Sequence, residues 1–567
     1  MTNHLIFIFY LLIFLFSTIG FGYLFSIFFF KDFRTLNFGY QGIIGFFTIC
    51  LISVFTSFFF PHNFVHNTLL HLVGLVLFFW NFFQNKKDNI LQIKRLIFIF
   101  LALAIGVYVF KNHDDFPYYH LTFSLNLSQN GFIIGQGIFS NGFKTASSIF
   151  YYHSTLYLPF IKFYLFHSGP FLILIYFNYI ILSKIFNKFK KNEFDIVYFL
   201  SLLNFIFVNI VFYRIGEHGT DRTGQILLFL IFIILFELFF LKKNLKEKNI
   251  LFNFLLISVF LAASMKALFY IYLVIFPLIL IKDKFYKQYL VNKNLVIIFV
   301  IIFSFSINST SNFFSTGCLL FPEEKTCIGK FDWSVPQKDV SRLKIHFEWW
   351  AKAGGGPGYS SSIEPKIYVK NFVWVKDWID RHFFNKVSDT LLGILFISFL
   401  NLLLFRGPKK KKIIPRNIIL INSILFLFFI EWFLKHPAMR YGGFVLFALP
   451  IFIYTSKIVE SYKISKKKIL ISTVLLIFLT FFCYNVRNVS RLNKEINNYN
   501  PGYNLLKSPF FHVDNVRVNT VYEDKYFKIY SPIDNMCWAA PTPCIYYKGN
   551  LKVKNWNGFK IIYRAEE

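Results

Sequence analysis

Residues 96–110 read LIFIFLALAIGVYVF, and after two intervening residues, positions 113–120 read HDDFPYYH. The first segment is apolar enough to cross a membrane, although it is shorter than the usual span of about 20 residues. The second segment places two carboxylates, two histidines and two tyrosines where that helix would leave the bilayer. Ionisable groups at that position are costly and commonly functional. We therefore predict a functional corner here, with Asp114 and Asp115 as candidate catalytic carboxylates.

The composition is that of a membrane protein with many spans. Of the 567 residues, 56% are hydrophobic and 22% are aromatic, and the mean hydropathy is +0.51. Soluble globular domains are much less apolar. The 82 Phe, together with abundant Ile, Lys and Asn, indicate an AT-rich coding bias in a bacterium, so an aromatic stripe is expected to face lipid unless another feature marks it.

The net charge of +31 does not indicate a nucleic-acid partner, because the basic residues occur in short clusters between apolar runs. Such clusters are typical of cytoplasmic loops that follow the positive-inside rule. They lie at residues 86–95, 184–191, 242–248, 282–293, 406–416 and 457–468.

The apolar runs predict an all-α polytopic membrane protein with about 14 transmembrane helices. The predicted spans lie near residues 5–30, 38–60, 68–84, 96–110, 170–187, 195–213, 226–241, 251–281 as two short spans, 295–307, 388–405, 417–434, 442–456 and 469–484. A tight outer turn at Lys266 keeps the basic clusters on either side of it in the cytoplasm. This topology predicts a bacterial inner (plasma) membrane protein with both termini on the periplasmic side.

Five regions follow from this topology. They are the N-terminal spans (1–95), a membrane core with outer acidic loops (96–307), an extracytoplasmic loop (308–388), the C-terminal spans (389–484) and a small mixed extracytoplasmic C-terminal domain (485–567). Within the core, residues 120–168 mix aromatic and small polar residues, and we expect helices that lie in the membrane interface there.

The six cysteines divide between the predicted compartments. Cys318 and Cys327 lie in the long outer loop, and Cys537 and Cys544 lie in the polar tail. A close pair in each outer segment favours two local disulfides in an oxidising compartment. Zinc is the alternative, although nothing in the sequence has the usual Cys-x-x-Cys spacing.

Further polar residues fall on the predicted outer side. Asp221 is the third candidate catalytic carboxylate. Side chains in the outer segments could bind an anionic substrate, with cations to hold a phosphate leaving group while a carboxylate activates a hydroxyl. These substrate-binding candidates are Arg222, Arg440, Lys266, His113, Tyr118 and His218.

Each of these signals has a simpler alternative. An Asp pair at a helix end is often only a solvated boundary, and Arg222 beside Asp221 is compatible with a plain ion pair. Arg440 near a span end is compatible with snorkelling to lipid headgroups. The histidines have no fixed metal-ligand spacing, so no metal residues are assigned, although a carboxylate pair leaves a divalent metal possible.

The acidic pair in an outer loop, the interfacial helices after it, a second acidic loop and the many spans resemble the GT-C superfamily of membrane glycosyltransferases. This resemblance implies that Asp114 or Asp115 is the general base, that Asp221 is the second acidic residue, and that Arg222 and Arg440 bind the carrier phosphate. The chain departs from the superfamily pattern, because three extra spans precede the first acidic loop.

A second resemblance concerns the cysteine segments. Gly317-Cys318-Leu319 with Pro322 and Cys327, and the tail motif CWAAPTPC at residues 537–544, resemble a family of large bacterial membrane proteins of unknown function. This second resemblance implies no activity.

The sequence thus predicts a membrane glycosyltransferase that uses a polyprenyl-phosphate-linked sugar donor and modifies an envelope glycan or lipid, with membrane lipids around it and no nucleic acid. Two alternatives stay open. One is a transporter or flippase of a lipid-linked or anionic substrate, and the other is an envelope polysaccharide polymerase or ligase.

Overall fold

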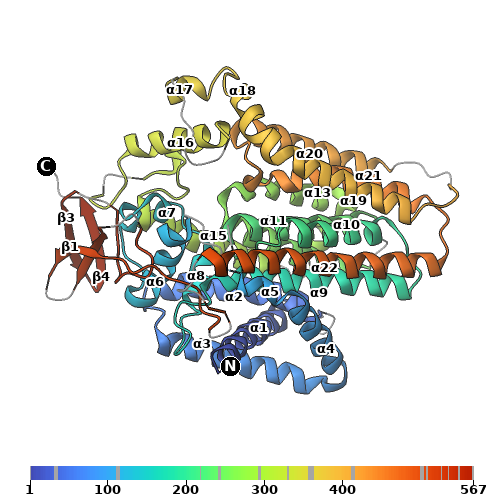
Figure 1. The fold of residues 1–567 in the computed structure, drawn as a ribbon, viewed down its shortest axis with the longest axis horizontal. Coiled ribbons are helices and arrows are strands. Elements are labelled where there is room, and N and C mark those ends of the chain that lie inside the picture. The colour runs from blue at the N-terminus through green and yellow to red at the C-terminus, as the bar shows by residue number, and fades with distance from the viewer. Residues whose placement is uncertain are drawn as a thin grey trace.

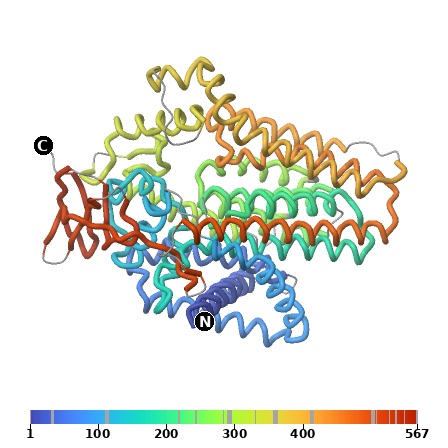
Figure 2. The backbone as a smooth tube through the Cα atoms, in the orientation of Figure 1, coloured from blue at the N-terminus to red at the C-terminus, as the bar shows by residue number. Residues whose placement is uncertain are grey.

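The computed structural model describes residues 2–564 except for short segments at 31–35, 110–114, 217–218, 241–243, 292–294, 329–330, 355–362, 410–414, 499–503, 506–507, 525–526, 534–535 and 547–548. Helices dominate this part of the chain, and four short strands follow the last of them. Figures 1 and 2 show the long helices side by side in one bundle, with the strands beyond one end of it.

Eleven helices in the described part of the chain are long and apolar enough to cross a membrane. The chain is therefore a multi-pass α-helical membrane protein. The eleven are α1 (Thr2–Phe29), α2 (Phe38–Ser57), α3 (Phe64–Gln84), η4 with α9 (Phe166–Lys190), α11 (Gly219–Phe240), α12 (Leu245–Met265), α15 (Leu295–Thr316), α18 to α19 (Val375–Leu404), α20 (Arg416–Lys435), α21 (Gly443–Glu460) and α22 (Lys466–Asn498).

The other predicted spans are occupied by shorter or more polar helices. Two shorter apolar helical segments are α10 (Ile196–Val211) and η5 with α13 (Ala267–Ile281). The predicted span 96–110 corresponds to the end of α4 (Lys86–Leu103) and to α5 (Ile105–Tyr108).

Several helices extend beyond the apolar runs that predicted them. The helix α15 continues to Thr316, α22 continues to Asn498, and the helical run before α19 starts at Val375. A helix satisfies its own backbone hydrogen bonds in water as well as in lipid, so hydropathy marks the membrane-embedded part and not the helix end.

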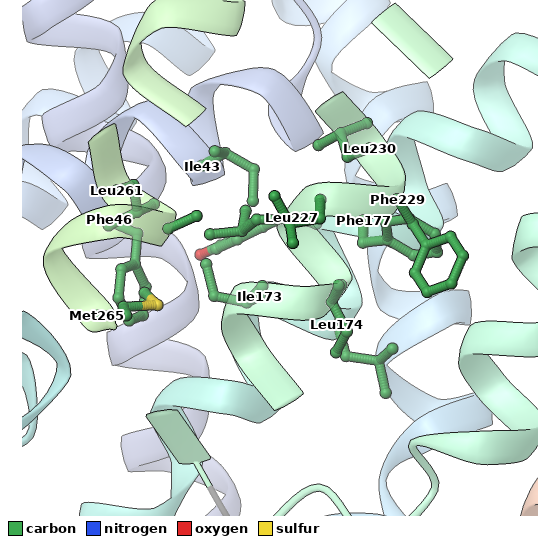
Figure 3. Packing of buried hydrophobic residues seen from close by; sticks show 14 of the residues in the cluster. Ile43, Phe46, Ile173, Leu174, Phe177, Leu227, Phe229, Leu230, Leu261 and Met265 are labelled. Carbon is green, nitrogen blue, oxygen red and sulfur yellow. The ribbon is translucent and has the colours of Figure 1, made fainter. Parts of the chain in front are cut away.

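The centre of the bundle is formed by α2, α9, α11 and α12. Figure 3 shows Ile43 and Phe46 of α2 packed with Ile173 of α9, Leu227 of α11 and Met265 of α12, all of them buried. By contrast, α3, α19 and α20 keep many large apolar side chains exposed. Such exposed apolar faces are the ones expected to meet lipid.

Glycines let α1 and α2 approach each other closely. A Cβ atom on Gly22 would lie 1.7 Å from the carbonyl oxygen of Gln41, and one on Gly45 would lie 1.7 Å from the carbonyl oxygen of Thr18. Only glycine fits at such crossings, and small residues are the usual contact between membrane helices.

The two ends of the bundle differ. At one end lie the strands, α7 (Asn141–Lys144) and α16 (Gln337–Lys352), while the connections from α9 to α10 and from α21 to α22 lie at the other (Figure 1). Basic clusters lie in the connections at the second end. There the backbone N–H of Lys463 donates to the carbonyl oxygen of Pro408.

The end that carries the strands also holds the short helices of the predicted outer segments. Besides α7 and α16 they are η2 (Phe116–His120), α6 (Leu121–Asn130), α8 (Ser148–Ser154), α17 (Pro365–Tyr368), η8 (Ile379–Val387) and η9 (Met439–Tyr441). Every residue of α8 is buried, because it packs against α2, α6 and α12.

The strands form two antiparallel hairpins, β1 (Val518–Glu523) with β2 (Lys528–Pro532) and β3 (Leu551–Trp556) with β4 (Phe559–Arg564). The second hairpin is joined to the rest of the chain at Ile134, whose N–H donates to the carbonyl oxygen of Lys560 and whose carbonyl accepts from Ile562. The C-terminal region therefore rests directly on the loop between α6 and α7.

Candidate functional site

Four charged side chains from distant parts of the chain meet at this end of the bundle. Arg440 donates from Nε to Oδ2 of Asp221 at 2.5 Å and from an Nη atom to Oδ2 of Asp115 at 3.1 Å. Lys266 donates to Oδ1 of Asp221. The two cations and two carboxylates thus form one connected network.

Helix ends bring these groups together. Asp221 lies in the first turn of α11, and Lys266 is the C-cap of α12. Because α11 and α12 are consecutive, packed helices, the start of one lies beside the end of the other. A carboxylate at a helix start and a cation at a helix end are both favoured by the helix dipoles. Arg440 enters from η9, the short turn between α20 and α21.

Asp221 is the fully buried member of the network, with no exposed surface. An unpaired carboxylate in that position would be strongly destabilising. Both of its oxygens are taken by cations, which makes Asp221 the anchor that fixes Lys266 and Arg440 in position.

A cavity of about 400 Å³ opens beside the network. We call it the site cavity. The acidic and basic residues of its lining are Asp115, Lys266 and Arg440. Asp221 lies behind them and is not part of the lining. The other lining residues used below are Tyr118 of η2, Phe321 and Pro322 of the Cys318–Cys327 loop, His346, Phe347 and Trp350 of α16, and His436 and Tyr441 between α20 and α21.

Aromatic rings surround the two cations. The Lys266 ammonium lies 4.0 Å from the centroid of the Tyr441 ring. The Arg440 guanidinium carbon lies 5.5 Å from the Trp350 ring and 5.7 Å from the Tyr441 ring. These cation–π contacts hold the cations at the cavity wall and partly dehydrate them.

The charge of the cavity follows from burial and from the partners of each group. Burial lowers the pKa of Lys266 to about 8, although the negative charge of Asp221 acts to raise that pKa. Burial also lowers the pKa of His436 to about 4, and it lowers the pKa of His346. At neutral pH the two imidazoles are uncharged, so Lys266 and Arg440 supply the positive charge.

The residues singled out from sequence fall into three groups. Asp115, Tyr118, Lys266 and Arg440 line the site cavity, and Asp221 supports it from behind. Arg222 is not among the lining residues, and one of its Nη atoms donates to the carbonyl oxygen of Arg214. His113, Asp114 and His218 lie outside the described residues.

Sequence reasoning missed the wall that α16 forms. His346, Phe347 and Trp350 share one face of this helix and line the cavity. The segment Phe347-Glu348-Trp349-Trp350 is the available signal, because paired tryptophans beside a charged residue are unusual in a polar outer loop. His436 was also missed, although it stands four residues before Arg440.

Both outer cysteine pairs are disulfides, Cys318–Cys327 and Cys537–Cys544. The second disulfide loop sits on the functional corner, because the N–H of Trp538 donates to the carbonyl oxygen of Pro117 at 3.1 Å. The Tyr546 ring, just after that loop, lies 4.6 Å from the Tyr118 ring. The C-terminal region therefore braces η2, which begins directly after Asp115.

Within the described residues, no three His, Cys, Asp or Glu side chains are grouped so that they could hold a metal ion. The chemistry that the site cavity offers is that of one lining carboxylate beside two fixed cations. Such a set can accept a proton at one point and stabilise an anion at another.

The fold and site define a multi-pass membrane protein with a charged, aromatic cavity at one end of its helix bundle. The family described as a domain of unknown function, DUF8201, matches residues 4–447. The chain belongs to this family, and the match covers every residue of the network. No curated protein matches the chain, and no solved structure does.

Proposed function

We propose that this chain is a membrane glycosyltransferase of GT-C type that takes a sugar from a polyprenyl-phosphate carrier and adds it to an envelope glycan or lipid. In this proposal the chain has about 14 spans in a bacterial inner membrane. Both termini and the site cavity face the periplasm. The observation that carries the proposal is the meeting of Asp115, Arg440 and Lys266 in one cavity.

The reaction is a single displacement. The acceptor hydroxyl oxygen attacks the anomeric carbon of the donor sugar, the new C–O bond forms, and the bond from that carbon to the phosphate oxygen breaks. Asp115 takes the hydroxyl proton, and the polyprenyl phosphate leaves as an anion. Arg440 and Lys266 face the same cavity and stabilise that anion as its charge develops.

Asp221 acts through the two cations. Because its carboxylate holds both of them and does not line the cavity, we assign it a positioning role and leave the general-base role to Asp115. Fixed cations lose little free energy to reorganisation when the leaving group forms. Aromatic side chains such as Trp350 and Tyr118 offer flat surfaces for sugar rings.

The transporter alternative calls for charged residues along a path through the bundle. Here Asp115, Lys266 and Arg440 are gathered around one cavity at one end, while Lys184 and Glu237 form a separate ion pair near the other end of α11. This arrangement supports a transferase over a transporter. A polysaccharide polymerase or ligase would use the same donor and the same cavity, so it remains a variant of the proposal.

The test compares cells with and without the gene by mass spectrometry of lipid-linked sugars and envelope glycans. The proposal expects a glycan or lipid that lacks one sugar in the deletion strain, with the unused polyprenyl-phosphate sugar accumulating. Intact glycans with a lipid-linked intermediate held on the cytoplasmic side would favour a flippase. Shortened polymers of unchanged repeat composition would favour a polymerase.

A further inference from the structure

A second cavity, of about 490 Å³, lies on the other side of α16. We call it the lysine cavity. In α16, His346, Phe347 and Trp350 line the site cavity, and Ile345, Glu348 and Lys352 line the lysine cavity. At 100° per residue these two sets fall on opposite faces of one helix. The helix α16 is therefore a shared wall between two separate cavities.

The lysine cavity carries excess positive charge. Lys352, Lys366, Lys370 and Lys435 line it, and Glu348 is its one lining carboxylate. Glu348 is already engaged, because Lys352 contacts it at 2.6 Å and Lys435 approaches it to 3.6 Å.

Two of the lysines are available to a ligand. Among the described residues, neither Lys366 nor Lys370 has an acidic partner within ion-pair distance, and both side chains are exposed. Lys352, in contrast, is buried and held, since its ammonium also donates to the carbonyl oxygen of Val369 at 2.7 Å and lies 5.1 Å from the Trp374 ring. The cavity thus has a fixed, buried cation at its base and two exposed cations at its mouth.

The position of the cavity relates it to the membrane boundary. Leu434 and Lys435 of its lining are the last residues of α20, and Trp374 immediately precedes the helical run Val375–Leu404. Both are candidate membrane spans. The apolar part of the second run begins only near residue 388, so it is the end of α20 that places the cavity near the level of lipid headgroups.

Apolar side chains are exposed beside the lysines. Phe372 is 60% exposed and Val373 is 43% exposed, in the turn that also carries Lys370. Phe372 has a positive φ of 56°, which is uncommon for a bulky residue and costs free energy. Exposed Phe and Val beside a cluster of lysines favour a ligand with an apolar part, such as an acyl chain, whereas a site for a soluble anion would not need them.

We propose that the lysine cavity binds a phosphate-bearing membrane lipid, with the phosphate at Lys366 and Lys370 and the first acyl carbons against Phe372 and Val373. Lys352 and Lys435 set the positive potential, and the bound lipid holds α16 against the end of α20. This site is separate from the site cavity, and the proposal does not depend on the transferase activity.

The test is native mass spectrometry of the delipidated full chain in detergent, titrated with dioleoyl phosphatidylglycerol and with dioleoyl phosphatidylcholine. We expect tighter binding of the anionic lipid. The double variant K366Q/K370Q should lose about 30-fold in affinity for it, because each lysine near a lipid surface contributes about 1 kcal/mol and about 1.4 kcal/mol is tenfold. Lys366 and Lys370 are both exposed, so the variant should fold, which a thermal melt verifies.

The matched control is K338Q/K376Q. Lys338 and Lys376 are exposed lysines on α16 and α18 that do not line the cavity, so the net charge changes equally. Equal lipid affinity in the two double variants would overturn the proposal, as would equal binding of the two lipids. Two results together would assign the site to a soluble anion and overturn the lipid assignment. Inorganic phosphate would displace phosphatidylglycerol at matched concentration, and F372A would bind phosphatidylglycerol as tightly as wild type.

Discussion

Arg440 and Asp221 are joined by a 2.5 Å contact from Nε to Oδ2, although 219 residues separate them in the chain. The same guanidinium contacts Asp115, which lines the site cavity. One cation thus links a buried carboxylate to a cavity carboxylate. Changes at Asp221 are therefore expected to reach the cavity through Arg440 and Lys266.

Removing the charge of Asp221 should destabilise the protein. D221N removes the carboxylate partner of Lys266 and one of the two carboxylate partners of Arg440, and breaking such a buried pair costs about 3–5 kcal/mol. We expect a clearly lower melting temperature in detergent. D332N, at an exposed aspartate, is the control and should melt like wild type. Equal melting of D221N and wild type would mean that Asp221 does not anchor the network.

Binding of a phosphate leaving group should weaken as the pH rises through about 8, because the pKa of Lys266 is lowered to about 8 by burial. Below that pH the ammonium is charged and contributes to binding, and above it only Arg440 does. K266R keeps the positive charge and should remove this step. The measurement is the affinity for polyprenyl phosphate between pH 6 and 9.5, a range about 1.5 units or more on each side of the transition.

The second proton of the phosphate titrates near pH ~6, at the low end of this range, and that titration affects wild type and K266R alike. A wild-type curve that follows the K266R curve through the whole range would contradict the role given to Lys266.

Loss of the C-terminal disulfide should slow transfer without preventing insertion. C537S/C544S frees the loop that supports Pro117, so Asp115 at the start of η2 loses its fixed position. A displacement of about 1 Å can cost about 100-fold in rate. Transfer is measured in isolated membranes, with C483S as the control because Cys483 is an exposed free cysteine. An unchanged rate in C537S/C544S would contradict the bracing of η2 by the C-terminal region.

Much of the membrane architecture could be predicted from the sequence, because long apolar runs have few alternatives to spanning helices. Helix ends were less predictable, as the continuation of α22 to Asn498 shows. Polar residues beside spans, such as Lys266 and Arg440, stood out because charge is rare there.

The meeting of these residues could not be read from the sequence. Asp221 and Arg222 are neighbours in the chain, but consecutive helical residues point about 100° apart, and one joins the network while the other donates to Arg214. Trp350 was missed because the tryptophan pair of α16 marks the segment as unusual but does not show which of the two side chains faces a cavity. Asp114, His113 and His218 lie outside the described residues, and their roles stay predictions.

The most direct test of the central claim is complementation of the deletion strain by D115N, with D332N as the charge-matched control. Envelope glycans are measured by mass spectrometry, and the amount of inserted protein is verified in each strain. We expect D332N to restore the missing sugar and D115N to lower transfer by about 100- to 10,000-fold, the usual contribution of a general base. Full restoration of the glycan by D115N would contradict the assignment of Asp115 as the base.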